Sequence, residues 1–359
     1  FVQKEKVFLG TLTDGDIRRA IIGGANNDSN IESFCNKNAI SLPIFSSDKK
    51  LRDSLLINEI TLIPLINDQG TIVDYASQSR FNRFPVMEPS LEGNEKEYVN
   101  NCMDTNWISS QGAYVDAFEN ELSNLCNLNP CIATSSGTTA LHLALECLGI
   151  GSQDEVIVPN FTFGASVNSI IHSGATPVLV DIEPENWTIS TKKIISSITP
   201  KTKAIMPVHI YGNPCSMKKI MEIAKENNLL VIEDCAEALG ATIDGKPVGT
   251  FGDAAAFSFF ANKVITCGEG GAVSFKSEKN LIKAKMLRDH GMSRSKKYWH
   301  EYVGYNYRMT NIQAAIGCAQ LEQLDVFVKN RKEIWDLYNT ELLPTGYFES
   351  QKISAGYSQ

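Results

Sequence analysis

The sequence lacks the features that mark several large classes of protein. No apolar run approaches the roughly 18 residues that a membrane-spanning helix needs. No signal peptide is recognisable. The net charge of −8 argues against a positively charged surface that could bind nucleic acid. We therefore expect a cytoplasmic protein whose partners include neither a membrane nor nucleic acid.

Paired cysteine motifs are also missing. The nine cysteines are scattered and odd in number, and no CxxC motif occurs. Cys126 and Cys131 lack a second pair at zinc-finger spacing. These absences argue against a disulfide framework, and they predict reduced thiols and no metal site.

The ends of the sequence indicate a fragment of a longer protein. The chain starts at Phe1 without Met, within a strand-like pattern, and it ends at Ser358-Gln359 without a natural stop. Its 359 residues are 43% hydrophobic and 21% charged, which is enough for one to three globular domains.

Two regions of the chain differ in character. Residues 1–80 carry short apolar runs and helix-like stretches separated by turn signals. Residues 81–89 contain Pro85 and Pro89 and are predicted to be a linker. From residue 90 onward, helix and strand signals alternate. This alternation predicts an α/β fold with a mostly parallel sheet between helices.

The predicted strands of the second region are short and rich in β-branched residues. They include 131–133, 156–158, 177–180, 204–208 and 229–232, and the predicted helices include 95–104, 114–125 and 138–147. In parallel sheets, ligands gather where strand ends meet the following loops. The residues directly after each strand are therefore the candidates for chemistry.

Two of these strand ends carry a possible phosphate site and a possible ring contact. Gly137 and Thr138 open a helix in the run TSSGTTA, where free amides and the helix dipole suit a phosphate. A plain helix cap is an equally good interpretation. Phe163 follows the strand at 156–158 and could stack on a planar ring, although such an aromatic is more often part of the core.

Two further segments carry an acid and a lysine. Asp234 follows an apolar strand, where a pyridinium nitrogen would be a suitable partner; a helix cap or a salt bridge is the alternative. Lys263 lies between an aromatic run and a glycine-rich loop, with Ser258 five residues before it. A partly desolvated lysine suits a Schiff base, although a snorkelling lysine would look the same. Together these features match the requirements of pyridoxal 5′-phosphate.

Longer runs carry a family resemblance. SSGTTALHLAL (135–145), DEVIVPNFTF (154–163), VIEDCAEALGA (231–241), FGDAAAFSFFANKVITCGEGGAV (251–273) and GYNYRMTNIQAAIGCAQLEQL (304–324) resemble the DegT/StrS family of nucleotide-sugar aminotransferases. The resemblance covers roughly residues 84–359 and implies the fold type I aminotransferase architecture. It places the large cofactor-binding domain at 90–325 and the start of a truncated small domain at 326–359.

The resemblance implies roles for individual residues. Lys263 would hold the cofactor as a Schiff base and move the proton, while Asp234 would pair with the pyridinium nitrogen. Phe163 would stack on the ring, and the phosphate would be held by Gly137, Thr138 and Ser258.

Other implied roles concern the partner subunit and the sugar. Asn306 would reach the phosphate from the neighbouring subunit, which implies a homodimer. Ser109 and Ser110 lie where the family lines its sugar pocket. Family members that act as dehydratases replace the Schiff-base lysine with His, so Lys263 favours transamination.

One departure from the family pattern points to a subgroup. Glu237 stands where the family commonly has Gln, near the cofactor's phenolic oxygen, and this Glu is similar to the subgroup typified by GDP-perosamine synthase. The run Ile108-Ser109-Ser110 also fits that subgroup. A carboxylate beside a phenolate is repelled unless it is protonated or bridged, so we expect Glu237 to titrate unusually.

The N-terminal region resembles one incomplete pair of cystathionine-β-synthase (CBS) repeats, an α+β module. In GTLTDGD, Thr13 and Asp16 have the spacing of that domain's nucleotide signature, and they would contact phosphate and ribose. The corresponding stretch at 70–75 lacks this spacing. A vestigial structural module or dimer contact is the alternative.

These observations predict a transaminase. It would move an amino group from L-glutamate to a nucleotide-linked 4-keto-6-deoxy sugar, for the aminosugar of a surface polysaccharide. Two alternatives remain: a nucleotide-sensing regulatory protein with an idle transaminase-like domain, and an aminotransferase for another keto sugar or a keto-inositol.

Overall fold

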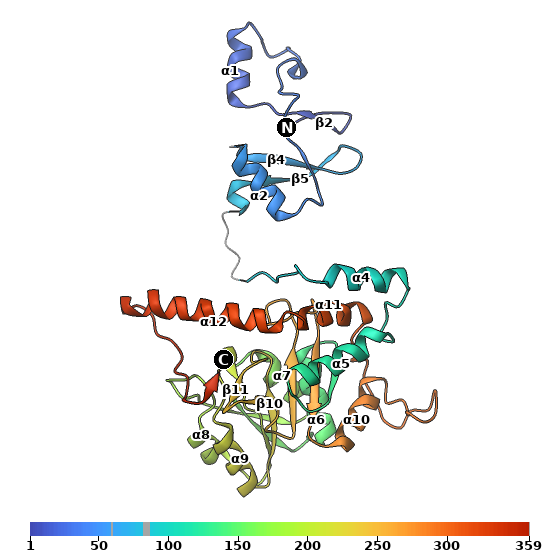
Figure 1. The fold of residues 1–359 in the computed structure, drawn as a ribbon, viewed down its shortest axis with the longest axis vertical. Coiled ribbons are helices and arrows are strands. Elements are labelled where there is room, and N and C mark those ends of the chain that lie inside the picture. Colours follow the sequence, from blue (N-terminus) through green and yellow to red (C-terminus); the bar gives the residue numbers. More distant parts are fainter. Residues whose placement is uncertain (59, 82–86, 359) are drawn as a thin grey trace. The chain divides into compact units, whose positions relative to one another are not determined.

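The computed structural model describes residues 1–58, 60–81 and 87–358, and the chain forms two compact units, 1–86 and 87–359 (Figure 1). The division falls within the linker predicted at 81–89. Residues 82–86 of that linker, Pro85 among them, lie outside the described residues. Each unit has a hydrophobic core of its own.

The first unit contains short strands and helices around a small core. A hairpin joins β1 (Val2–Lys4) and β2 (Val7–Gly10), and a three-stranded sheet has the order β3 (Leu42–Pro43), β4 (Leu62–Ile66), β5 (Ile72–Ser77). The helices are α1 (Asp14–Ile22), η1 (Ile31–Ser33), α2 (Asp48–Ile57) and α3 (Gln78–Phe81). Leu51 and Leu55 of α2 pack on Ile63 and Leu65 of β4, because these apolar residues share one buried face.

The second unit is built around a seven-stranded sheet. Its strands, in spatial order, are β6 (Cys131–Thr134), β14 (Gly271–Phe275), β13 (Ala254–Ser258), β10 (Leu230–Asp234), β9 (Thr202–Ile205), β7 (Glu155–Pro159) and β8 (Thr176–Val180). Only β14 runs antiparallel to its neighbours, and the pairs from β13 to β8 are parallel. The predicted α/β class with a mostly parallel sheet is therefore confirmed.

Both faces of this sheet are buried. In β7, Val156 and Val158 belong to one hydrophobic cluster and Ile157 to the other, and all three are fully buried. Successive side chains of a strand point to opposite faces, so helices must cover both sides. This requirement explains why the strands are almost continuously apolar.

The described helices of this unit are α4 (Glu95–Asp104), α5 (Ala113–Leu125), α6 (Gly137–Leu148), α7 (Gly164–His172), α8 (Thr191–Ser197), α9 (Met217–Glu226), α10 (Glu278–Arg288), α11 (Asn311–Leu321) and α12 (Leu324–Glu341). Among them, α4, α5 and α6 agree to within one residue at each end with the three helices predicted at 95–104, 114–125 and 138–147. Short elements complete the unit: η2 (Ile210–Gly212), η3 (Leu343–Thr345), and a small sheet of β12 (Lys246–Pro247), β11 (Thr242–Ile243) and β15 (Tyr357–Ser358).

Helices α11 and α12 lie nearly end to end along one side of the second unit (Figure 1). Helix α12 crosses the predicted domain boundary at residue 326 without a break, and that boundary stays a prediction. Within 1–58, 60–81 and 87–358, no helix combines the length and apolar character needed to cross a membrane.

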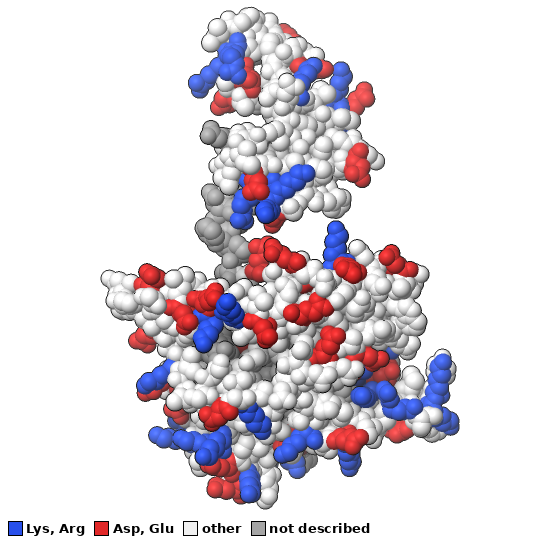
Figure 2. Space-filling model, viewed as in Figure 1, with Lys and Arg blue, Asp and Glu red and all other residues white. Residues whose placement is uncertain are grey.

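The surface and the thiols complete the description. Acidic and basic side chains are interspersed on the face of the molecule in Figure 2, which carries no extended basic patch. All nine cysteines belong to the described residues; none forms a disulfide, and eight of them are buried.

We predict that Phe118→Ala will destabilise the second unit strongly. Phe118 of α5 and Phe259 are fully buried and meet edge to face, with ring centroids 5.1 Å apart. Removing the ring leaves a cavity, so the free energy of unfolding should fall by about 3–5 kcal/mol in urea titrations. Tyr347→Ala removes an exposed ring and should change it by less than about 0.5 kcal/mol. Equal effects of the two substitutions would contradict the packing described.

Candidate active site

Three candidate residues of the second unit lie at one edge of the seven-stranded sheet. Ser258 ends β13, Asp234 ends the neighbouring β10, and Phe163 follows β7. Parallel strands present their carboxyl ends at the same edge of a sheet, so these residues lie on one side of the molecule. The sequence predicts that the chemically important residues lie directly after the strands, and these three residues lie at or after strand ends.

A glycine and a serine form the candidate phosphate site. Helix α6 begins at Gly137, and Ser136 caps it by accepting from the Thr139 amide at 3.2 Å. A Cβ added to Gly137 would lie 2.8 Å from the Ser258 Cβ, so the helix N-terminus and the end of β13 are in direct contact. Free amides and a nearby hydroxyl then face the same space, which suits a phosphate. Thr138 is the second residue of this helix.

Asp234 is a buried acid at the end of β10. One carboxylate oxygen accepts from the Ser166 hydroxyl at 2.7 Å and the other from the Ala236 amide at 3.1 Å. Burial raises the pKa of this carboxyl above its usual range, although these two hydrogen bonds lower it in part. A cation beside Asp234 would stabilise its ionised form, and a protonated pyridine nitrogen is such a cation.

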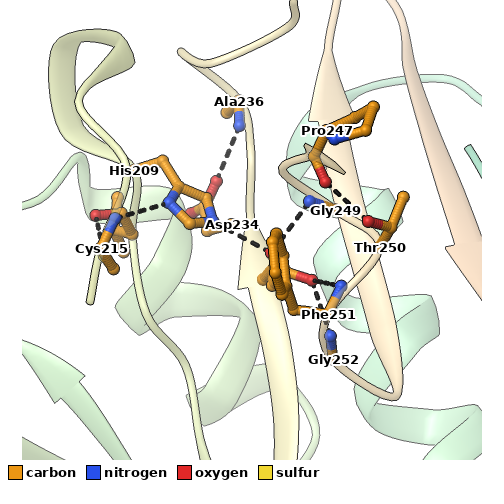
Figure 3. A network of polar contacts seen from close by, with 11 residues as sticks. His209, Cys215, Asp234, Ala236, Pro247, Gly249, Thr250, Phe251 and Gly252 are labelled. Carbon is orange, nitrogen blue, oxygen red and sulfur yellow. Dashed lines mark hydrogen bonds and ion pairs between the residues drawn. The ribbon is translucent and has the colours of Figure 1, made fainter. Parts of the chain in front are cut away.

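The neighbouring acid on the same strand has a structural role. Glu233 points to the opposite face of β10, where it accepts from the amides of Gly249, Phe251 and Gly252 at 2.7–2.9 Å and lies 3.2 Å from His209 Nε2. Figure 3 shows this network, including the His209 contact with Cys215. His209, Glu233 and Cys235 could geometrically form a metal site, but the oxygens of Glu233 already have protein donors.

Lys263 lies in the loop between β13 and β14 and is largely buried. Its Nζ is 3.6 Å from Glu237 Oε1, and the side chains of Lys263 and Glu237 are 17% and 24% exposed. The other Glu237 oxygen accepts from the Tyr211 amide at 2.8 Å. Arg331 of α12 donates from Nη2 to the Lys263 carbonyl at 3.0 Å. The backbone of Lys263 is therefore fixed by a hydrogen bond, and its amine lies beside a carboxylate.

A cavity of about 570 Å³ opens beside Lys263. The aromatic and charged residues of its wall include Tyr211, Glu237, Lys263, Arg331, Trp335 and Tyr357. Its size is within the range of pockets that enclose small organic molecules, and its wall combines aromatic rings with charged groups.

Of the residues predicted for the site, only Lys263 and Glu237 belong to the described wall of this cavity; the wall does not include Gly137, Thr138, Asp234 or Ser258. Four further predicted residues also lie outside it. Phe163 caps α7 and is 75% exposed, with its ring free to meet a ligand. Asn306 is exposed and accepts from Arg308 Nε at 3.2 Å. Ser109 is exposed and its carbonyl accepts from the Asn311 amide, while Ser110 is half-buried. No hydrogen bond or ion pair among the described residues joins Asn306, Ser109 or Ser110 to Lys263.

The two candidate residues of the first unit bond to each other. The Thr13 side chain accepts from the Asp16 amide, and the Asp16 carboxylate accepts from the Thr13 hydroxyl at 2.6 Å, which is a capping box for α1. Arg19 pairs with the other Asp16 oxygen at 2.5 Å. Both residues therefore have partners within the helix that they begin.

Three residues of the site were not predicted. Ser166 lies three residues after Phe163, in the first turn of the helix that follows β7. A polar residue in the first helical turn after a strand was the sequence signal that could have identified it. Tyr211 and Arg331 reach Glu237 and Lys263 from segments that are distant in sequence. No local pattern marks such contacts, because only the folded chain brings them together.

The residues present fit pyridoxal 5′-phosphate. The Gly137–Ser258 contact provides a phosphate cradle, the buried Asp234 lacks a cation in direct contact among the described residues, and Lys263 presents a primary amine to a cavity. Phosphate, ring nitrogen and aldehyde would each meet a matching group. These features define a pyridoxal-phosphate-dependent enzyme of the aminotransferase type.

Comparison with known proteins narrows this class. The model of the DegT/DnrJ/EryC1/StrS aminotransferase family matches residues 89–356. GDP-perosamine synthase from Escherichia coli O157:H7 is 53% identical over 258 residues, which cover 72% of this chain and 71% of that protein. The GDP-perosamine synthase of Caulobacter vibrioides is 51% identical, with 74% and 71% covered.

Solved structures show the same fold. An aminotransferase from Psychrobacter cryohalolentis superimposes with a TM-score of 0.70 at 36% identity, covering 74% of this chain and 71% of that one. DesV from S. venezuelae gives 0.69 at 34% identity, with the same coverage. The chain belongs to the DegT/DnrJ/EryC1/StrS aminotransferase family and is a sugar aminotransferase of fold type I that uses pyridoxal 5′-phosphate.

We predict that Gly137→Ala will weaken cofactor binding. The added methyl group would lie 2.8 Å from Ser258 Cβ and push apart the two sides of the phosphate cradle. We expect the dissociation constant for pyridoxal 5′-phosphate to rise about tenfold or more in absorbance titrations. Gly164→Ala is the control, because Gly164 also begins a helix and its added Cβ would meet nothing closer than 3.8 Å. Unchanged affinity in Gly137→Ala would contradict this phosphate site.

We predict that Asp234 makes the cofactor-free protein less stable as the pH rises. The ordinary pKa of this carboxyl is 3.8, and burial raises it in the folded state. Between the two values the native protein keeps a proton that the unfolded chain has lost, so the free energy of unfolding falls with increasing pH.

The test compares urea unfolding of cofactor-free wild type and Asp234→Asn from about pH 4 to about pH 7. The variant cannot ionise at this position, so its stability should decline less steeply. Asp325→Asn, at an exposed position in α12, controls for the loss of one charge. Identical slopes for wild type and Asp234→Asn would show that Asp234 is not the titrating group.

Proposed function

We propose that this protein transfers an amino group from L-glutamate to a GDP-linked 4-keto-6-deoxy sugar, forming GDP-perosamine for a surface polysaccharide. The observation that carries the proposal is the Lys263 amine, held 3.6 Å from Glu237 at a cavity of about 570 Å³. Identity of 49–53% to three GDP-perosamine synthases supports this substrate. The resemblance of Glu237 and the run Ile108-Ser109-Ser110 to that subgroup supports it as well.

The reaction uses the cofactor as an electron sink. When bound, pyridoxal 5′-phosphate supplies a conjugated ring that takes up the electron pair left when a proton is removed from the carbon beside the transferred nitrogen. Asp234 would keep the ring nitrogen protonated, because its buried carboxylate is best stabilised by a cation. Ser166 and the Ala236 amide orient that carboxylate through hydrogen bonds at 2.7 and 3.1 Å.

Lys263 is the proposed acid and base. Its amine would accept the proton from one carbon and return it to another, which requires a mobile side chain on a fixed backbone. Arg331 holds the Lys263 carbonyl at 3.0 Å, and Glu237 lies beside the amine. L-glutamate and the keto sugar would use the same lysine in turn, so we expect ping-pong kinetics.

A homodimer is part of the proposal. Asn306 is exposed and would contact the phosphate in the neighbouring subunit, as the family resemblance implies. The second unit would then need a second copy of itself to complete the site. Light scattering of the purified protein reports this assembly state directly.

We also propose that residues 1–80 are a partial CBS-like module with a structural role. Thr13 and Asp16 already satisfy each other in the cap of α1, and Arg19 pairs with Asp16. A nucleotide would have to compete with these contacts. This observation favours the structural interpretation over nucleotide sensing.

Replacing the reactive amine tests the proposed function. Lys263→Ala should lose the absorbance band of lysine-bound cofactor and slow the conversion of L-glutamate and keto sugar by more than about a thousandfold. Lys329→Ala is the control, since Lys329 is exposed on α12 and pairs with Glu333 in its own helix. Wild-type protein that binds the cofactor but does not convert it with L-glutamate or GDP-perosamine would contradict the proposal.

A further inference from the structure

Three aromatic side chains form a cluster beside the candidate active site. Phe161, Trp187 and Tyr211 meet edge to face, with ring centroids 6.1–6.3 Å apart and interplanar angles of 66–85°. Tyr211 is 59% exposed and Phe161 40% exposed, while Trp187 is half-buried. We call these three residues the aromatic cluster. Partly exposed aromatic rings present faces that a ligand can use.

The topology of the sheet explains why the three rings meet. Tyr211 follows β9, Phe161 follows β7 and Trp187 follows β8, and these strands are neighbours in the order β9, β7, β8. Their carboxyl ends therefore share one edge of the sheet. The next strand along is β10, which ends in Asp234. The aromatic cluster thus continues the same edge that carries the cofactor residues.

Two of the rings sit on strained backbone. Trp187 has φ of +61° and Tyr211 has φ of +52°, a left-handed conformation that aromatic residues rarely adopt. Hydrogen bonds stabilise the turns that carry these two residues. The Trp187 amide donates to the Glu183 carbonyl. Asn213 Nδ2 donates to the Asn186 carbonyl at 3.1 Å and so joins the turn at Tyr211 to the turn at Trp187. Such strain persists where the surrounding structure enforces it, and it concentrates at binding sites.

The cluster is linked to the reacting amine by one residue. The Tyr211 amide donates to one Glu237 oxygen at 2.8 Å, and the other oxygen is 3.6 Å from Lys263 Nζ. Tyr211 also lines the cavity beside Lys263. In a nucleotide sugar, the hexose ring carries the reacting carbon, whereas the nucleobase lies on the far side of a diphosphate. A cluster this close to Lys263 therefore suits the hexose better than the nucleobase.

From these observations we propose that Phe161, Trp187 and Tyr211 form a subsite for the hexose of the nucleotide sugar, with its C–H groups packed on the aromatic faces. The inference rests on the proposed function, and it adds the residues that select the sugar. L-glutamate has no such ring, so the cluster would contribute to sugar binding without contributing to donor binding.

The test compares wild type with Trp187→Leu and Phe161→Leu, both loaded with cofactor. Leucine keeps an apolar side chain and removes the aromatic face. The dissociation constant for GDP-perosamine should rise about tenfold in calorimetry for each variant. Affinity for GDP alone and the rate at which L-glutamate converts the cofactor should stay unchanged. Tyr338→Leu, an exposed ring on α12, is the control.

The outcomes separate this inference from the proposed function. Unchanged affinity for GDP-perosamine in both variants overturns the subsite. A loss of affinity for GDP as large as the loss for GDP-perosamine also overturns it, because the guanine base would then be the group that contacts the aromatic cluster. An unchanged glutamate rate shows that a variant is folded and loaded. If wild type converts its cofactor with neither L-glutamate nor GDP-perosamine, the proposed function itself fails.

Discussion

The buried carboxylate of Asp234 is the main physical constraint on the candidate active site. A charge at the end of an apolar strand is costly unless a cation or several donors stabilise it. Within the part of the chain that the structure describes, the Ser166 hydroxyl and the Ala236 amide are the groups that donate to it, and burial raises its pKa. The folded protein therefore carries an acid that a protonated cofactor ring would satisfy, so cofactor binding and charge stabilisation are coupled.

Two adjacent acids of strand β10 have different surroundings: Glu233 stabilises the fold, and Asp234 belongs to the candidate active site. Glu233 and Asp234 are adjacent, and alternation sends them to opposite faces. Glu233 is satisfied by three backbone amides of the 249–252 turn and supports the fold. Asp234 faces the ligand side. The same strand thus stabilises the 249–252 turn through Glu233 and carries the acid proposed to face the cofactor, Asp234.

The lysine loop depends on contacts from several segments. Glu237 contacts the Lys263 amine, Tyr211 contacts Glu237, and Arg331 holds the Lys263 carbonyl. These residues come from the end of β10, the turn after β9 and helix α12. A lysine that forms a Schiff base needs a positioned backbone, and the Arg331 hydrogen bond fixes the backbone of Lys263. This distribution of contacts also brings the aromatic cluster next to the reaction, since Tyr211 belongs to both.

Local patterns in the sequence determined the class of fold and the candidate residues at the strand ends. Short, almost continuously apolar runs are typical of a sheet covered on both faces, and the candidate residues Gly137, Asp234, Ser258 and Lys263 lie at or after the ends of such runs. Only the tertiary structure decided that Thr13 and Asp16 cap a helix, that Ser166 and Arg331 support the site, and that Phe161, Trp187 and Tyr211 meet. The physical reason is that local propensity acts within a few residues, whereas these contacts depend on strand order.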